Sequence, residues 1–149
     1  MLRAAREEDR AFLDGLFFER KQVEFAALGW PPPVLAAFLQ SQAAVRAQAL
    51  AGLESWVIVH GEVPVGQVLV GITPGALHVA EMVVSQSRRG QGLGTAALQE
   101  VLARADAEQR AVRLNVEHGN PAVRLYRRLG FRDDGPANEL GQPLLRSPA

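Results

Sequence analysis

The chain has 149 residues, of which 48% are hydrophobic and 21% charged, and its formal net charge at pH 7 is zero. This length suits one domain with a sizeable core, and the composition disfavours a disordered chain. No apolar run reaches the roughly 20 residues of a membrane-spanning helix, and no secretory signal is recognisable. We therefore expect a single cytoplasmic domain over residues 1–149 without membrane contact.

Cysteine is absent, and the three histidines, His60, His78 and His118, are widely separated. A disulfide, a thiolate nucleophile and a thiolate metal site are excluded, and we expect no bound metal. The 16 basic residues balance the 16 acidic ones. This balance argues against general nucleic-acid binding.

Turn residues and hydrophobic periodicity divide the chain into alternating elements. A glycine and three prolines at 29–33 cannot continue a helix and predict a rigid loop, in which Trp30 is a candidate substrate contact or a packing residue. The expected elements are strands at 2–4, 55–60, 63–72, 76–84 and 111–116, two short strands beginning at 131 and 144, and helices from 6–9 to about 24, at 34–49, at 95–109 and at 122–129.

A glycine-rich loop lies between the strand ending at Val84 and the helix that follows it: Arg88-Arg89-Gly90-Gln91-Gly92-Leu93-Gly94-Thr95. Its three glycines let the backbone take positive φ and let a ligand approach the N–H groups without interference from a Cβ atom. The free N–H groups and the positive dipole end of the next helix would point at the same ligand. The loop is therefore predicted to bind a phosphate or pyrophosphate, and its two arginines add positive charge.

Three kinds of phosphate-binding loop compete for this sequence. A Walker-type loop needs a lysine, and none lies near this loop. The dinucleotide fingerprint can be aligned with Gly92 to Ala97, but it usually follows the first strand of a βαβ series, whereas antiparallel hairpins precede it here. The remaining pattern, Arg/Gln-x-x-Gly-x-Gly/Ala, is filled by Arg89 to Gly94 and resembles the coenzyme A pyrophosphate loop of the GNAT superfamily of acyl-CoA-dependent N-acyltransferases.

A second block strengthens this resemblance. Residues 120–131, Asn-Pro-Ala-Val-Arg-Leu-Tyr-Arg-Arg-Leu-Gly-Phe, are similar to the Asn…Tyr…Gly-Phe segment near the end of these enzymes. Residues 2–9 resemble the opening strand and helix, and residues 57–66 the central hairpin. The resemblance implies a mixed α/β (α+β type) fold: a twisted, mostly antiparallel sheet of about six to seven strands, about four flanking helices, and a V-shaped splay between the fourth and fifth strands.

The resemblance also implies where acetyl-CoA, the acyl donor, would bind. Its pantetheine arm would enter the V beside Met82, Val83 and Val84, where a backbone N–H near Val84 would polarise the thioester carbonyl. Asn120 would bind the pantetheine side, and Tyr126 would lie near the sulfur. The pyrophosphate would be wrapped by Arg89, Gly90, Gln91, Gly92, Leu93, Gly94 and Thr95.

Acyl transfer to an amine needs a base for the amine and an acid for the leaving thiolate. Tyr126 occupies the family's position for the general acid. The alternative is that Tyr126 is an ordinary buried tyrosine whose ring only packs in the core. Glu81 lies just before the cofactor-contacting residues and is the candidate base, acting through a water. An alternative of equal weight is that Glu81 forms a salt bridge or occupies a solvated strand position. His78 and Glu117 are weaker candidates.

The predicted reaction is transfer of an acetyl group to a primary amine by direct attack in a ternary complex, on a small-molecule or peptide acceptor that the sequence does not identify. Residues 19–34 and 137–146 would line its site. The alternatives are a non-catalytic acyl-CoA-binding or sensing module and a nucleotide-dependent oxidoreductase. The last strand looks short, and because a partner subunit closes the site in some relatives, a monomer or a homodimer is expected.

Overall fold

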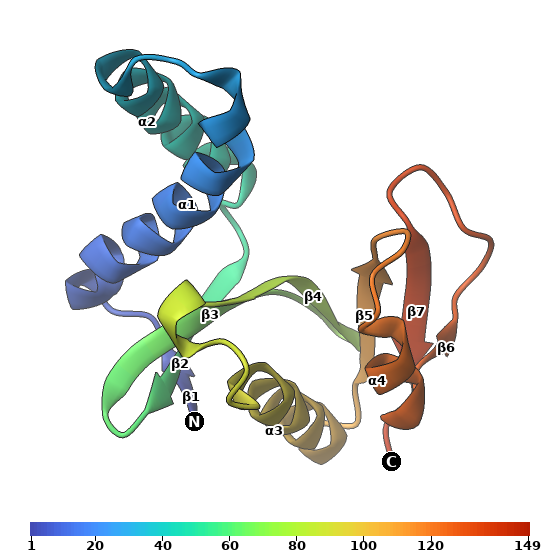
Figure 1. Ribbon diagram of the computed structural model, residues 1–149. Coiled ribbons are helices and arrows are strands. Elements are labelled where there is room, and N and C mark those ends of the chain that lie inside the picture. The colour runs from blue at the N-terminus through green and yellow to red at the C-terminus, as the bar shows by residue number, and fades with distance from the viewer.

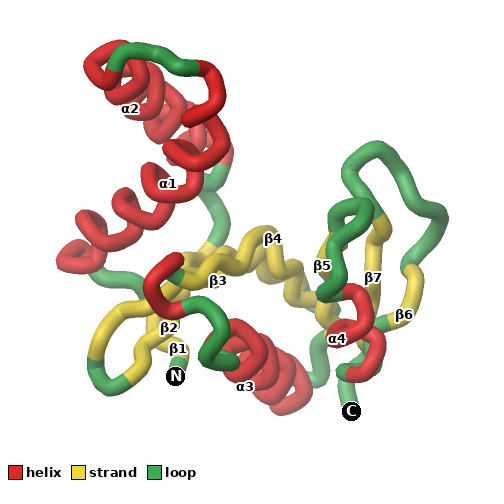
Figure 2. Tube along the Cα trace, in the orientation of Figure 1, coloured by secondary structure: helices red, strands yellow, loops and turns green.

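The computed structural model describes residues 1–149, folded around one seven-stranded sheet (Figures 1 and 2). The strands are β1 (Leu2–Ala4), β2 (Glu54–His60), β3 (Val63–Thr73), β4 (Ala76–Val84), β5 (Ala111–Val116), β6 (Arg132–Asp133) and β7 (Gln142–Arg146). The α-helices are α1 (Arg10–Phe25), α2 (Pro32–Ala49), α3 (Leu93–Ala107) and α4 (Val123–Arg128), and 3-10 turns occupy η1 (Glu7–Asp9), η2 (Ala26–Leu28) and η3 (Gln86–Arg88).

These elements confirm the expected order, with differences at several of their ends. Pro32 and Pro33 lie in the first turn of α2 instead of in the preceding loop, because proline needs no hydrogen-bond acceptor at that position. Helix α3 begins at Leu93, two residues before the expected start. The final strand is not frayed, since all five residues of β7 pair with β5 from Val112 to Val116.

The sheet opens between β4 and β5, as expected for the fold. The strand order is β1-β2-β3-β4-β5-β7-β6, and β4 and β5 form the only parallel pair. That pair ends at His78 and Arg113, so the second half of β4 hydrogen-bonds to β3 alone. The backbone of β4 from Val79 to Val84 therefore has one edge facing the opening.

A β-bulge lies in β4 where it leaves β5. Leu69 of β3 faces Glu81, whereas the next residue, Val70, faces Val79, so Ala80 has no partner in β3. A bulge bends its strand and increases the local twist. The bulge therefore directs the second half of β4 away from β5 and helps to open the sheet.

The two faces of the sheet are covered differently (Figure 1). Helix α3 packs under the sheet and contributes Leu98, Val101 and Ala105 to the main core. On the other side, α1 and α2 form a helical hairpin that projects away from the sheet, and Leu39 is the only buried residue of α2. No helix is both long and apolar enough to span a membrane.

Candidate active site

The glycine loop joins β4 to α3. Gly90 and Gly92 have φ angles of +79° and +74°, and a Cβ atom at either residue would meet nothing within 4 Å. Gly94 differs from the expectation, because it lies in the first turn of α3 and its φ is not positive. A Cβ atom there would lie 3.7 Å from Cγ2 of Val84. This is an ordinary packing distance, so a small side chain would fit at position 94, and only Gly90 and Gly92 have the positive φ angles expected of the loop.

The start of α3 presents free backbone donors to this loop. Gly92 is the N-cap residue, and no side chain caps the helix. The first intrahelical hydrogen bond runs from the N–H of Ala96 to the carbonyl of Gly92 at 3.0 Å. The N–H groups of Leu93, Gly94 and Thr95 have no acceptor within the helix, as at any helix start, and this arrangement suits an anion.

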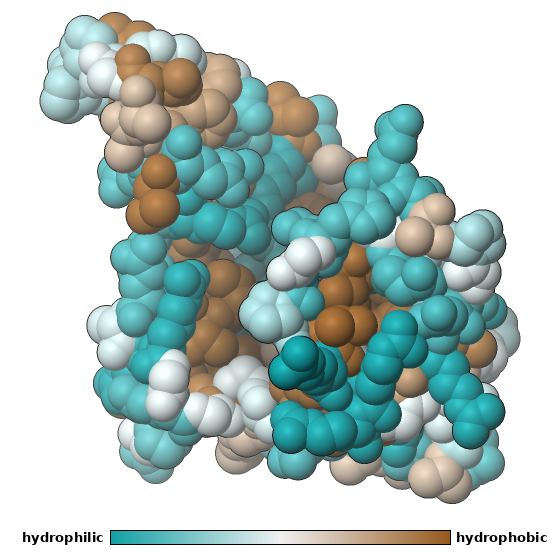
Figure 3. All heavy atoms as spheres, turned by 45° about the vertical axis from the view of Figure 1, so that its right-hand side comes forward, coloured by the Kyte–Doolittle hydropathy of each residue, from teal (hydrophilic) through white to brown (hydrophobic).

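A cavity of about 520 Å³ lies beside the opening and is lined by residues of the β5–α4 connection. Asn120 and Glu117 line both this cavity and a smaller one of about 270 Å³ inside the opening. Figure 3 shows hydrophobic residues in the hollow between the helical hairpin and the C-terminal part. The smaller cavity, called the splay cavity below, is lined by Arg20, Val79, Ala80, Glu81, Met82, Leu98, Leu114, Asn115, Glu117, Asn120 and Tyr126.

The splay cavity brings together five residues that the sequence singled out on β4 and between β5 and the end of α4: Glu81, Met82, Glu117, Asn120 and Tyr126. Val83 and Val84 follow on the same half-buried end of β4 and pair with β3. The glycine loop continues from this strand end to α3. The residues expected to bind the donor on β4 therefore lead along the chain, through η3, to the glycine loop and the start of α3.

Tyr126 lies on α4 with its ring packed edge-on against Phe131, 5.8 Å between ring centroids. Burial raises the pKa of its hydroxyl above the ordinary value of 10.0. A buried phenol loses hydration that would stabilise the phenolate. The hydroxyl therefore remains protonated at neutral pH and can donate.

Asn120 organises the turn before α4. Its side-chain oxygen accepts a hydrogen bond from the N–H of Ala122 at 2.9 Å. The helix expected at 122–129 has Ala122 as its N-cap and begins at Val123. An asparagine can hydrogen-bond to the backbone two residues later and form a turn of its own, which delays the helix start.

Glu81 is held by two arginines. Its Oε1 accepts from Nη1 of Arg20 on α1, and its Oε2 accepts from Nη2 of Arg46 on α2. Of the alternatives for Glu81, the salt bridge is confirmed, whereas its role as a base stays a prediction. The sequence contained no signal for these partners, which lie 61 and 35 residues away in the chain.

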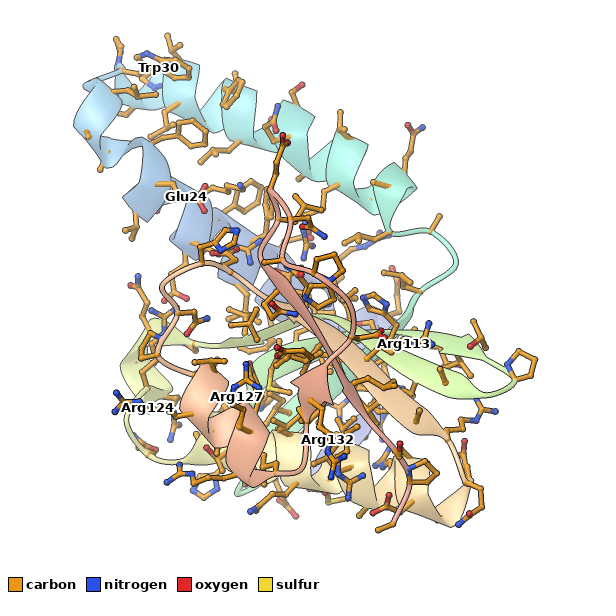
Figure 4. All side chains as sticks on the ribbon, turned by 90° about the vertical axis from the view of Figure 1, so that its right-hand side faces the viewer. Glu24, Trp30, Arg113, Arg124, Arg127 and Arg132 are labelled. Carbon is orange, nitrogen blue, oxygen red and sulfur yellow. The ribbon has the colours of Figure 1, made fainter.

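Several other candidates lie outside the splay cavity. His78 is exposed on the part of β4 that still pairs with β5. His118 bonds to the carbonyl of Asn138 at 2.6 Å. Trp30 packs against Phe25 and Phe38 of the helical hairpin and not against the sheet. Figure 4 places Trp30 at the far end of that hairpin. From the two segments expected to line the acceptor site, Arg20 alone lines this cavity.

A sheet that opens beside a helix start with free N–H groups, with a protonated tyrosine at the opening, fits a transferase that holds a phosphate-bearing donor. A profile of the acetyltransferase (GNAT) family matches residues 10–131 of the chain. The chain belongs to this family and is an acetyltransferase.

Solved structures of acetyltransferases share the fold. The PaiA N-acetyltransferase of Thermoplasma acidophilum, in complex with coenzyme A, has a TM-score of 0.71 at 13% identity, over 99% of this chain and 98% of that one. A Corynebacterium glutamicum protein described as histone acetyltransferase HPA2 and related acetyltransferase has a TM-score of 0.71 at 22% identity, over 100% and 96%. A GNAT family acetyltransferase from Elizabethkingia anophelis, with acetyl-CoA bound, has a TM-score of 0.58 at 14% identity, over 70% and 82%.

Proposed function

We propose that this acetyltransferase uses acetyl-CoA to acetylate a primary amine by direct attack in a ternary complex. The observation that carries the proposal is the edge of β4 beyond His78, which faces the opening and leads to the start of α3. An extended pantetheine arm can pair with such an edge, as an added strand does. The pyrophosphate can then accept hydrogen bonds from the first turn of the helix.

The surroundings of this path fit the donor. Met82, Val83 and Val84 would contact the pantetheine arm, and Asn120 would face it from the other wall. The open space around Gly90 and Gly92 leaves room for phosphate oxygens near the backbone. The pyrophosphate would be bound by Arg89, Gly90, Gln91, Gly92, Leu93, Gly94 and Thr95.

The reaction joins the amine nitrogen to the acetyl carbonyl carbon and breaks the bond between that carbon and the sulfur. The nitrogen loses a proton, and the departing thiolate gains one. A backbone N–H near Val84 would stabilise the negative charge that develops on the carbonyl oxygen. Tyr126 would protonate the sulfur, and the burial that raises its pKa keeps that proton available.

The base that accepts the amine proton is proposed to be Glu81, acting through a water. Because both of its oxygens accept from guanidinium groups, it can take a proton only by weakening one of these contacts. Glu117 lines the same cavity from the end of β5 and is in none of the ion pairs of the chain. It is the second candidate for this role.

Tyr126→Phe separates an enzyme from a non-catalytic acyl-CoA-binding module. Loss of the hydroxyl should lower kcat about 10²- to 10⁴-fold, the usual contribution of a general acid. The phenyl ring keeps its packing on Phe131, so the Kd for acetyl-CoA from calorimetry should stay close to that of the wild type. Thiol release with a panel of amines gives the rate.

Two outcomes would contradict this proposal. If the wild type binds acetyl-CoA but releases no thiol with any amine, the binding-module alternative gains support. If acetyl-CoA gives no rise in Tm, although a bound ligand stabilises the native state by mass action, the donor assignment is wrong. Nicotinamide nucleotides, tested alongside, should produce no rise.

A further inference from the structure

The ion pairs around Glu81 leave one positive charge uncompensated. Arg20 and Arg46 each contact Glu81, and neither takes part in any other salt bridge. Two guanidinium groups therefore share one carboxylate, and the cluster carries a net charge of about +1 because both arginines remain ionised. Glu81 is only 20% exposed, so solvent screens this charge less than it would at the surface.

Of the three residues in this cluster, Arg20 is the arginine whose side chain lines the splay cavity. It lines the splay cavity together with Glu81. Arg46 does not line that cavity, and its guanidinium lies over the ring of Phe17, 5.2 Å from the centroid. An anion in the cavity would therefore meet Arg20 first.

The hydrogen bonding of Arg20 is incomplete. Its Nη1 donates to Glu81, but its Nε is the one buried side-chain nitrogen or oxygen in the chain without a hydrogen-bond partner. Buried polar groups nearly always have partners, and a donor without one is costly. Nε and Nη2 form the edge with which a guanidinium binds a carboxylate through two parallel hydrogen bonds. A ligand carboxylate would use this edge after a small rotation of the side chain.

The opposite wall of the splay cavity suits an amine. Glu117, Asn120 and Tyr126 line it, and none of them carries positive charge. Glu117 can attract an ammonium group, and Tyr126 is the proposed acid at the thioester. The volume of about 270 Å³ equals that of about nine water molecules, so only a small head group fits.

We propose, on the basis of the proposed function, that the acceptor is an α-amino acid or a molecule ending in an α-amino acid head group. Its carboxylate binds the Nε–Nη2 edge of Arg20, and its amino group faces Tyr126 and Glu117. A polycationic amine without a carboxylate has no group for this edge of Arg20. Acceptor choice thus depends on a residue of the helical hairpin and not on the donor-binding sheet.

The proposal is tested with pairs of amines that differ only at the carboxylate. Eighteen standard amino acids and their C-terminal amides are assayed by thiol release with saturating acetyl-CoA, with spermidine as a polycationic amine. Cysteine is left out because its own thiol would be detected, and proline because it is a secondary amine. The carboxylate raises the pKa of the neighbouring amine, so kcat/KM is calculated on the concentration of neutral amine. Arg20→Gln removes the positive charge and the Nε–Nη2 edge. Arg46→Gln is the matched control, because it also removes one contact of Glu81 but does not alter the residues that line the cavity.

For the best substrate, the wild type should prefer the amino acid to its amide about tenfold to a hundredfold, as expected for a charge-assisted hydrogen-bonded pair. Arg20→Gln should abolish this preference through KM, Arg46→Gln should retain it, and Arg20→Lys should retain part of it.

Equal or better turnover of the amides, or preference for spermidine, would overturn the carboxylate assignment while the N-acetyltransferase function stands. An equal loss of preference in Arg46→Gln would also overturn it, because the effect would then come from Glu81. Binding of acetyl-CoA without acetylation of any of these amines would refute this inference. The proposed function would be refuted as well only if no amine of the wider panel is acetylated.

Discussion

Gly66 of β3 is the residue whose enlargement should disturb the donor-binding strand most directly. It faces Val84 across the β3–β4 pair. A Cβ atom on Gly66 would lie 2.4 Å from the carbonyl oxygen of Val83, 3.2 Å from Cα of Val84 and 2.9 Å from Cδ1 of Ile58. The isoleucine methyl can rotate away, but the two backbone atoms move only if the end of β4 moves.

Gly66→Ala should therefore cost the free energy of overpacking, typically about 1–3 kcal/mol, offset by about 0.4–1 kcal/mol because alanine restricts the unfolded chain. The net destabilisation of up to about 2.6 kcal/mol corresponds to a fall in Tm of up to about 10 °C for a domain of this size. Displacement of Val83 and Val84 should also weaken acetyl-CoA binding about two- to tenfold, the effect of one lost hydrogen bond of 0.5–1.5 kcal/mol.

Gly71→Ala is the matched control on the same strand. Its Cβ atom would meet Cδ2 of Leu53 at 3.2 Å, the movable end of a side chain, and Cβ of His78 at 4.0 Å. It should leave both stability and the Kd for acetyl-CoA nearly unchanged. Urea unfolding followed by circular dichroism and calorimetric titration measure the two effects. Equal stability and equal affinity of the two variants would refute the reasoning that Gly66 sets the position of β4.

Three further results are expected. Gly92→Ala should weaken acetyl-CoA binding but not that of acetyl-pantetheine, because it strains a residue with φ of +74° beside the pyrophosphate, and equal losses for both ligands would contradict this role. Hydrogen bonds from arginines lower the pKa values of Asp9 and Asp106 from 3.8 to about 2. The free energy of unfolding that these two groups contribute is therefore present above pH 3.8 and is lost as the pH falls towards 2. Acid unfolding of Asp106→Asn should accordingly show a weaker pH dependence than that of the wild type. Because burial raises the pKa of Tyr126, kcat should not fall on the alkaline side below pH 10, and an earlier fall that Tyr126→Phe abolishes would contradict the burial argument.

The parts of the site that the sequence predicted are those governed by short stretches of chain. Positive φ at Gly90 and Gly92 and the helix that starts next to them follow from local backbone preferences. The strands around the central hairpins follow from alternation and turn residues. The resemblance of residues 120–131 identified Asn120 and Tyr126 as site residues, and both line the splay cavity with Glu81 and Met82.

The end positions of elements were less predictable, because neighbouring signals compete there. The presence of Pro32 and Pro33 is compatible both with a loop and with the first turn of a helix, and the structure places them in the first turn of α2. Asn120 has the side chain of an N-cap but forms its own turn with the N–H of Ala122, so α4 begins only at Val123. Gly94 has the spacing of a loop glycine, but it lies in the first turn of α3 without positive φ.

Only the tertiary structure decided what surrounds Glu81. Strand alternation indicated which way its side chain points, but not that α1 and α2 would fold back over it and supply Arg20 and Arg46. These contacts join residues that are 61 and 35 positions apart, and no local preference specifies such pairings. They depend on how the helical hairpin packs against the open sheet. The sequence alone therefore determined the fold and the conformation of the glycine loop at Gly90 and Gly92. The tertiary structure decided which charges surround Glu81, because Arg20 and Arg46 come from elements that meet only in the folded chain.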